Sequence, residues 1–289
     1  MGMEQRGRLY ICATPIGNLE DITLRTLRVL NEVDLIAAED TRNSLKLLNH
    51  FDIKTPMTSY HEHNRYEKAE VLVEKLLGGM DIALITDAGT PAISDPGEEL
   101  VRQCHVAGVE VTSLPGPSAF VTALTISGRS TRRFCFEAFL PQDRRERQAV
   151  LEELKTETRT ILIYEAPHRL KKTLGELYEA LGDRNISLCR ELTKRHEANF
   201  RTTLSGAIAY YETEEPRGEF VLVIEGISRQ TLIEADRQQY ETMCISEHVA
   251  LYMEQGMDKK EAMKRAAKDR GVGKREIYQA LLEEQKGEG

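Results

Sequence analysis

The sequence LITDAGTPAISDPG, residues 84–97, contains the most informative pattern of the chain. It continues an apolar run that begins at Ile82, which is typical of a strand buried on both faces. The run stops at Asp87 in a turn of small residues that exposes backbone N–H groups. Asp95 and Pro96 then predict the N-cap and first residue of a helix.

Such a loop suits a small polar cofactor, because open α/β sheets bind ligands beyond the carboxyl ends of their strands. An ordinary connection between a strand and a helix would have the same composition, since Gly and Pro interrupt any loop. The loop alone therefore leaves both interpretations open.

The same arrangement recurs in the first half of the chain. Apolar runs over 8–13, 33–38 and 109–114 are each followed by a loop with small or charged residues. We therefore expect an α/β domain that gathers its loops at one sheet edge. A dinucleotide fold is excluded because TPIGNL, residues 14–19, has one glycine where GxGxxG needs three, and the Walker A pattern is absent.

The composition becomes polar over residues 128–133, and we place a domain boundary there. Further strands are expected over 134–139, 160–164, 186–189 and 219–225. Two charged clusters, YEAPHR at 164–169 and RELTKRHE at 190–197, directly follow strands. Either could be a solvated loop, but their shared position favours the wall of a cleft.

Composition and charge exclude several classes of protein. The chain has 289 residues and a formal net charge of −8, which argues against a protein that coats nucleic acid with its whole surface. No apolar run reaches the roughly 20 residues of a membrane span, and no signal-peptide core is present, so we expect a cytoplasmic protein. Five scattered cysteines predict neither disulfides nor a zinc site. His61 and His63 lack a third ligand, so we expect no metal.

The C-terminal part differs from the rest. Residues 227–241 resemble a linker, and a helical pattern follows from residue 243. Ala267, Gly271 and Ile277 take the small, turn and core positions of a helix-turn-helix, with Val272 packing after the turn. Residues 258–278 contain eight Lys and Arg against four Asp and Glu, so this span carries +4 while the rest carries −12. A solvated helix pair is one explanation, but a local positive face favours contact with nucleic-acid phosphates.

Together these motifs resemble those of the tetrapyrrole methylase-like family of S-adenosylmethionine-dependent enzymes. The motifs that carry this resemblance are ATPIGNLEDIT (13–23), AEDTR (38–42), LITDAGTPAISDPG (84–97), LPGPSA (114–119), RFCFEAFLP (133–141), YEAPHR (164–169), RELTKRHE (190–197) and GEFVLVIEG (218–226). The chain is most similar to members that methylate the ribose 2′-hydroxyl of a cytidine in the decoding region of 16S rRNA.

The resemblance implies a two-domain α/β fold of the tetrapyrrole methylase type, with the cofactor in the cleft between the domains, and a homodimer. The expected parts are a cofactor-binding domain over 1–128 and a second α/β domain over 129–228 that closes the cleft. From the residue pattern, 229–289 is expected to be a linker and a helical, locally basic tail with a small all-α helix-turn-helix-like module. The residues that it places near S-adenosylmethionine are Pro15, Asp87, Ala88, Gly89, Thr90, Ser118, Ala119 and Tyr164.

Alignment and deprotonation of the acceptor would fall to the protein, because the reactivity of the methyl group belongs to the cofactor. The candidates for this work are Lys194, Glu197, Glu39 and His168. The candidates for holding the phosphates of 16S rRNA, within the small ribosomal subunit, are Arg42, Arg169 and Arg190, and in the basic tail Lys264, Arg265, Lys274 and Arg275.

Two other functions remain possible from the sequence. The same fold could methylate carbon atoms of a tetrapyrrole, which would leave the basic tail unexplained. A DNA-binding regulator that senses the cofactor would use the helix-turn-helix, but it has no evident need for the charged clusters of the second domain.

Overall fold

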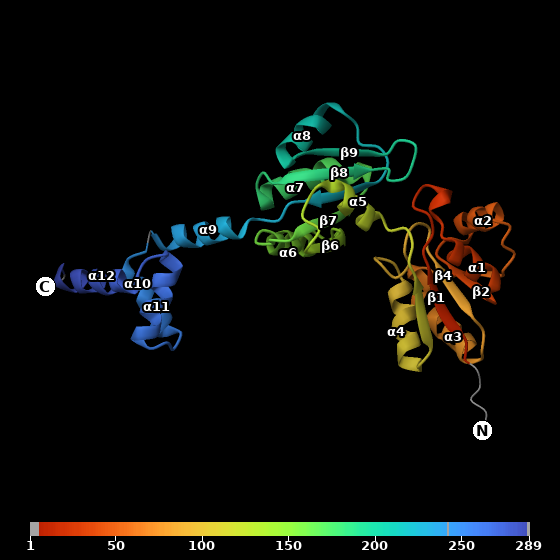
Figure 1. The fold of residues 1–289 in the computed structure, drawn as a ribbon, viewed down its shortest axis with the longest axis horizontal. Coiled ribbons are helices and arrows are strands. Elements are labelled where there is room, and N and C mark those ends of the chain that lie inside the picture. The colour runs from red at the N-terminus through yellow and green to blue at the C-terminus, as the bar shows by residue number, and fades with distance from the viewer. Residues whose placement is uncertain (1–5, 242, 288–289) are drawn as a thin grey trace, which may run out of the picture. The chain divides into compact units, whose positions relative to one another are not determined.

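The computed structural model describes residues 6–241 and 243–287. It consists of two compact units (Figure 1). The larger unit contains the chain up to residue 152 together with 160–225, and the smaller unit contains 153–159 and 226–289. Both β-sheets lie in the larger unit, and the smaller unit is mainly helical.

The first sheet is entirely parallel, with strand order β3-β2-β4-β1-β5. Its strands are β1 (Arg8–Cys12), β2 (Leu35–Ala38), β3 (Met57–Ser59), β4 (Ile82–Ile85) and β5 (Glu110–Leu114). Its covering helices are α1 (Leu24–Glu32), α2 (Thr41–His50), α3 (Arg65–Leu77) and α4 (Gly97–Ala107). Core side chains of α1 and α2 pack on one face, and those of α3 and α4 pack on the other. Burial on both faces explains the continuous apolar runs.

Local capping fixes where these helices begin. Thr23 caps α1 by accepting a hydrogen bond from the Thr26 amide at 3.0 Å. The prediction for α4 was wrong by one residue, because Pro96 is the N-cap and the helix begins at Gly97. Asp95 Oδ1 still accepts from the amides of Ala92 and Gly97, so the carboxylate satisfies the donors that a cap would satisfy.

The second sheet is mixed, with strand order β6-β7-β10-β8-β9. Its strands are β6 (Phe134–Phe139), β7 (Thr160–Glu165), β8 (Asn185–Arg190), β9 (Ala198–Thr203) and β10 (Phe220–Ile224). Its helices are α5 (Ala119–Ser127), α6 (Arg144–Leu154), α7 (Pro167–Leu181) and α8 (Leu204–Thr213). Although α5 precedes residue 128, its buried face packs on β7, β8 and β10. Neither β9 nor α8 was predicted from the sequence. For β9 the reason is that it is a polar edge strand without an apolar run.

The C-terminal unit contains α9 (Arg229–Glu241), α10 (Ile245–Glu254), α11 (Lys259–Arg270) and α12 (Lys274–Gly287). The predicted linker over 227–241 was therefore wrong, since most of it is helical. Gly271 ends α11 in the left-handed conformation at φ 66°, as a helix-turn-helix requires. Ala267 and Ile277 lie in the core of this unit. Val272 does not, because 37% of its surface remains exposed.

The structure confirms the predicted α/β class with a helical C-terminal region. No helix among the described residues is long and apolar enough to cross a membrane. Within the same part of the chain, no group of three or more His, Cys, Asp and Glu side chains could hold a metal ion. His61 and His63 lie in or beside a short 3-10 helix, η2 (Glu62–Asn64), rather than on a strand.

Candidate active site

Three loops of the first sheet are joined to one another at the carboxyl ends of its strands. Thr14 and Gly89 exchange backbone hydrogen bonds of 2.9 and 3.0 Å, which link the loops after β1 and β4. Thr90 Oγ1 donates to the carbonyl of Pro117 at 2.9 Å, which links the loop after β5. The small residues of these loops therefore form one hydrogen-bonded surface.

Glycine is required at two points of this surface. Gly89 has φ +85°, which disfavours an L side chain, and a Cβ there would lie 3.4 Å from Ile16 Cγ2. A Cβ at Gly116 would lie 2.6 Å from the Cβ of Ala13. In the loop after Gly89, Ala92 and Ser94 have φ of 65° and 63°, which are strained values for residues with side chains. Strain of this kind gathers at functional sites.

A cavity of about 440 Å³ lies against these loops. Its lining residues are Ile16, Ala88, Gly89, Thr90, Ile93, Ser118, Ala119, Phe139, Tyr164, Glu165, Ala166, Pro167, Cys189, Leu192, Lys194, Glu219, Phe220 and Val221. The volume lies within the range of about 300–1,000 Å³ that is usual for small-molecule sites, and the lining is mostly apolar with few polar groups.

Six of the eight residues predicted to bind the cofactor line this cavity, and Pro15 and Asp87 do not. These two line an adjoining hollow of about 330 Å³ on α2 and the 14–19 loop. Asp87 is exposed, and its carboxylate accepts from the amide of Asp40 at 3.3 Å and from Asn43 Nδ2 at 3.1 Å. The carboxylate thus also ties the loop after β4 to the start of α2.

The ammonium group of Lys194 lies at the polar edge of the cavity. Its Nζ is 3.0 Å from Glu191 Oε1 and 3.0 Å from Glu219 Oε2. Burial acts to lower the pKa of Lys194, but the two carboxylates outweigh it and raise that pKa above its ordinary value. Lys194 is therefore a cation at neutral pH, which suits it to stabilise negative charge rather than to remove a proton.

Two observations fix the position of the Lys194 loop. A Cβ on Gly17 would lie 2.3 Å from Lys194 Cγ, so the first loop of the chain packs directly against this side chain. Glu191 and Thr193 have φ of 50° and 65°, so the turn that presents Lys194 is strained. Loops of both sheets thus meet at Lys194.

The other three residues predicted to be catalytic lie outside the cavity lining. Glu197 is exposed and accepts from the Thr193 amide at 2.5 Å, which braces the Lys194 turn. Glu39 accepts from Thr86 Oγ1 at 2.5 Å. His168 is exposed in the first turn of α7.

Tyr164 joins the cavity to α5. Its hydroxyl oxygen accepts a hydrogen bond from the Phe120 amide at 3.3 Å, and burial raises the pKa of its hydroxyl. The rings of Phe136 and Phe139 lie 4.9 and 5.6 Å from the Tyr164 ring, between centroids. The aromatic wall is therefore held from several sides.

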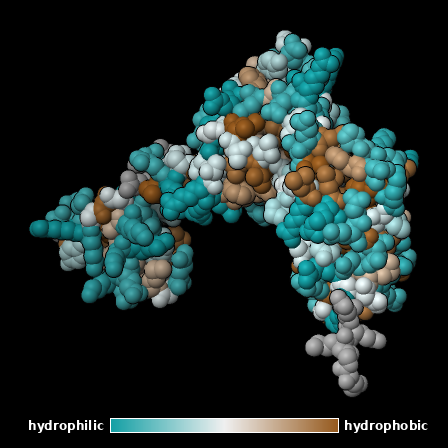
Figure 2. Space-filling view, turned by 45° about the vertical axis from the view of Figure 1, so that its right-hand side comes forward, coloured by the Kyte–Doolittle hydropathy of each residue, from teal (hydrophilic) through white to brown (hydrophobic). Residues whose placement is uncertain are grey.

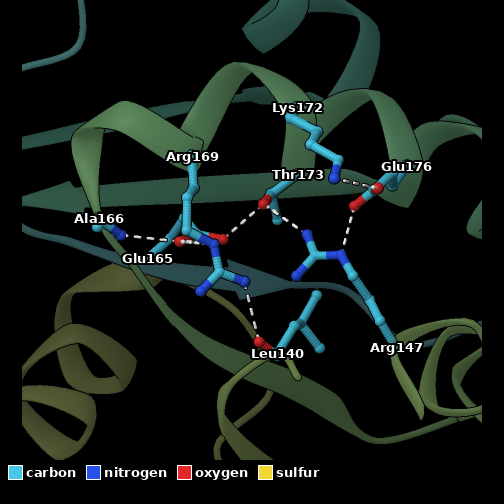
Figure 3. A network of polar contacts seen from close by, with 8 residues as sticks. All are labelled: Leu140, Arg147, Glu165, Ala166, Arg169, Lys172, Thr173 and Glu176. Carbon is cyan, nitrogen blue, oxygen red and sulfur yellow. Dashed lines mark hydrogen bonds and ion pairs between the residues drawn. The ribbon is translucent and has the colours of Figure 1, made fainter. Parts of the chain in front are cut away.

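Glu165, which follows Tyr164, belongs to a buried polar network (Figure 3). Its Oε2 accepts from Thr173 Oγ1 at 2.5 Å, and Thr173 in turn accepts from Arg147 Nη2 at 2.7 Å. Arg169 pairs with Glu165 at 3.5 Å and donates to the Leu140 carbonyl at 2.9 Å. Arg169, a predicted phosphate ligand, is thus engaged inside the protein.

The other predicted substrate ligands lie on the surface. Arg42 is 88% exposed and pairs with Asp40 at 3.0 Å, while Arg190 is half-buried and lines a separate hollow. Lys264, Arg265, Lys274 and Arg275 are all exposed on α11 and α12 of the smaller unit. The surface of this unit is mostly hydrophilic on the face seen in Figure 2.

Glu219, which lines the cavity, and Glu191, which holds Lys194, were not predicted from the sequence as site residues. Both lie inside quoted motifs at the ends of strands, so their position was a usable signal. The apolar lining, such as Ile93, Leu192 and Phe220, gave no such signal, because these residues resemble core residues of any strand or loop.

The chain matches one family model and is similar to several proteins that share one name. Residues 8–208 match the model of the family "Tetrapyrrole (Corrin/Porphyrin) Methylases". The protein named ribosomal RNA small subunit methyltransferase I of Halalkalibacterium halodurans is 47% identical, over 97% of this chain and 96% of its own length. The protein of the same name from Bacillus subtilis is also 47% identical, over 96% of this chain and 95% of its own.

Solved structures share the fold at low sequence identity. Diphthine synthase matches with a TM-score of 0.59 at 13% identity, covering 76% of this chain and 90% of its own. Uroporphyrin-III-C-methyltransferase from Thermus thermophilus matches with a TM-score of 0.54 at 20% identity, covering 75% of this chain and 94% of its own.

Proposed function

Because the chain belongs to the tetrapyrrole methylases, and within them to the ribosomal RNA small subunit methyltransferase I proteins, we propose that it transfers a methyl group from S-adenosylmethionine to 16S rRNA. The acceptor that we propose is the ribose 2′-hydroxyl of a cytidine in the decoding region. The observation that carries the proposal is the apolar cavity with a charged lysine at its edge. A ribosomal substrate would place the enzyme in the cytoplasm, and we retain the homodimer as part of the proposal.

The cavity suits S-adenosylmethionine in size and chemistry. The missing Cβ of Gly89 lets backbone approach a ligand, and Ala88, Thr90, Ser118 and Ala119 add small side chains and amides around it. The aromatic ring of Tyr164 offers a flat apolar wall for an adenine. When bound, the cofactor supplies a methyl group that its sulfonium has already activated. Pro15 and Asp87 would contact it from the adjoining hollow.

The remaining work belongs to the protein side chains. Lys194, held as a cation by Glu191 and Glu219, is placed to stabilise the charge that develops on the 2′-oxygen as its proton leaves. Glu219 lines the cavity and lies 3.0 Å from Lys194, so we assign it the role of accepting that proton. Glu197 would act by bracing the Lys194 turn. Glu39 and His168 lie outside the cavity lining, so they could act only on an acceptor that the bound RNA places near them.

A labelling experiment tests the proposal. The protein is incubated with methyl-labelled cofactor and, separately, with small ribosomal subunits, naked 16S rRNA, duplex DNA or a tetrapyrrole. We expect label in the rRNA, and we expect the labelled nucleotide to resist alkaline cleavage, because a methylated 2′-oxygen cannot attack its phosphate. Label in the tetrapyrrole alone, or in an alkali-sensitive rRNA position, would contradict the proposal.

A further inference from the structure

A second hollow lies beside the strand end that carries the Lys194 loop. It has a volume of about 450 Å³ and is polar. Its lining residues are Arg190, Glu191, His196, Glu214, Glu215, Arg217 and Gly218. Nothing in the proposed cofactor site uses Arg217 or His196.

The hollow is lined by three carboxylates and two arginines, and the two arginines form no ion pair among the described residues. Glu191 pairs at 3.0 Å with Lys194, a cation that it shares with Glu219, and accepts from the Glu219 amide at 2.9 Å. Glu215 pairs with Lys171 at 2.7 Å, outside the hollow lining. Glu214 is exposed at the rim. In the described part of the chain neither Arg190 nor Arg217 forms an ion pair, although, against the effect of burial, the charge of Arg190 helps to lower the pKa of Glu191. Both guanidinium groups keep N–H donors that an anion could use.

This hollow shares a wall with the cavity. The Glu191 amide donates to the Glu219 carbonyl at 3.0 Å, so two backbone segments form the wall. Lys194 and Glu219 line the cavity, whereas Glu191 and Gly218 line the hollow. The two segments are packed closely, because a Cβ on Gly218 would lie 2.4 Å from Glu191 Cγ.

The covalent structure of RNA brings a phosphate close to any ribose 2′-oxygen. A ribose 2′-oxygen is separated from the phosphorus of its own 3′-phosphate by only four covalent bonds. A nucleotide whose 2′-oxygen lies at Lys194 must therefore place a phosphodiester just beside the cavity. We propose that the hollow binds this backbone phosphate, with Arg190 and Arg217 as its cations and His196 as a further donor. Guanidinium groups suit the task because they bind phosphate oxygens in pairs.

This inference rests on the proposed function, and the test uses the full chain with 16S rRNA. The variants are Arg217→Gln, which removes the charge, and Arg217→Lys, which keeps the charge but loses the paired hydrogen bonds. Arg102→Gln is the matched control, since Arg102 is an exposed arginine on α4 that pairs with Glu99 away from this hollow.

For Arg217→Gln we expect KM for RNA to rise about tenfold. The log–log salt slope of RNA binding should fall by about 0.7–0.9, which corresponds to one phosphate contact. Arg217→Lys should keep the salt slope and lose part of the affinity. Cofactor affinity by calorimetry and the melting temperature should not change, because Arg217 is exposed and does not line the cavity. Arg102→Gln should match the wild type throughout.

Two outcomes would overturn the inference, and they differ from each other. If the wild type methylates 16S rRNA and Arg217→Gln keeps its KM and salt slope, the hollow holds no phosphate while the proposed function stands. If the wild type transfers no methyl group to rRNA, the proposed function fails and the inference fails with it.

Discussion

Lys194 Nζ lies 3.0 Å from Glu219 Oε2 at the edge of the cavity. The two residues come from loops at the ends of β8 and β10, which are neighbouring strands of the second sheet. The pair helps to raise the pKa of Lys194, so the ammonium keeps its proton while it faces the place where a methyl acceptor would enter. A fixed cation at that point lowers the energy of a developing oxyanion without any reorganisation.

Replacing Lys194 should therefore affect the chemical step more than binding. We expect Lys194→Ala to lower kcat by about 10²–10³-fold, as the loss of one donor to an oxyanion does. Cofactor affinity should change little, because the other cavity residues remain. Single-turnover methylation and calorimetry measure the two effects, with Lys54→Ala, a surface lysine that pairs with Asp52, as the control. A wild-type rate for Lys194→Ala would move the catalytic role to Glu39 or His168.

Arg147 and Lys172 both pair with Glu176, and we expect their replacement to lower the stability of the protein by different amounts. Arg147 pairs with Glu176 at 2.5 Å and is 7% exposed, whereas Lys172 pairs with Glu176 at 3.6 Å and is 76% exposed (Figure 3). We expect Arg147→Met to cost about 3 kcal/mol of unfolding free energy, because it removes the donor to the buried Thr173 hydroxyl and the closer cation of Glu176. Lys172→Met should cost less than about 0.5 kcal/mol. Urea denaturation measures both, and a cost below about 0.5 kcal/mol for Arg147→Met as well would mean that the network contributes little stability.

Much of the site was predictable because its signals are local. Apolar runs that stop at glycine and small residues located the strand ends, and in a parallel sheet all these ends lie at one edge. The loop after β4 was found in this way, while its residues Ala88, Gly89 and Thr90, which line the cavity, were named from the family resemblance. The sequence alone therefore located the loops of the site that follow strands of the first sheet.

The remainder depended on packing between distant segments. Asp87 follows the same strand as Ala88, yet it lines the adjoining hollow with Asn43. The backbone of the turn around Gly89, and not the residue type, determines which hollow each side chain of this loop faces. The role of Glu219 also requires its loop to lie beside Lys194, 25 residues earlier in the chain. The helix α9 was missed because its sequence lacks an apolar stripe of helical spacing.

The tail should show pH-dependent stability because of a buried histidine. His248 is fully buried, its Nδ1 accepts from Arg270 Nε at 3.0 Å, and its ring stacks on Tyr240 at 3.9 Å. Burial and the charge of Arg270 lower the pKa of His248 below 6.5, although Asp269, 3.8 Å away, opposes them. The unfolded chain therefore binds a proton more readily than the folded tail does.

The direction of the pH dependence is set by this difference in proton binding. The stability that His248 contributes is complete above the unfolded pKa of about 6.5, and it decreases as the pH falls toward the lower folded value. Hydrogen exchange of α10 and α11, corrected for the intrinsic rate, should show less protection at about pH 5 than at about pH 7.5. His248→Gln should remove most of this difference. Protection that is equal at both pH values in the wild type would contradict the prediction.

The last prediction concerns the basic residues of α11 and α12. If they hold rRNA phosphates, replacing all four by Gln should weaken RNA binding and lower its salt slope by about 0.7–0.9 for each phosphate that is no longer bound. The residues to replace are Lys264, Arg265, Lys274 and Arg275. Cofactor affinity should not change, because every residue that lines the cavity precedes residue 222. Arg265 also pairs with Asp269 at 3.6 Å, so the melting of the tail must be checked in parallel.

A control variant separates local phosphate binding from a change in net charge. It replaces four cations of the larger unit by Gln, namely Arg28, Lys54, Lys75 and Arg102, which lowers the net charge by the same amount. If the tail binds RNA, the tail variant should show a much larger decrease in affinity and salt dependence than this control, because charges within a Debye length of the phosphates dominate. Equal decreases would mean that the tail acts only through overall charge. If neither variant differs from the wild type in KM or salt slope, the helices serve another purpose, such as the dimer or solubility.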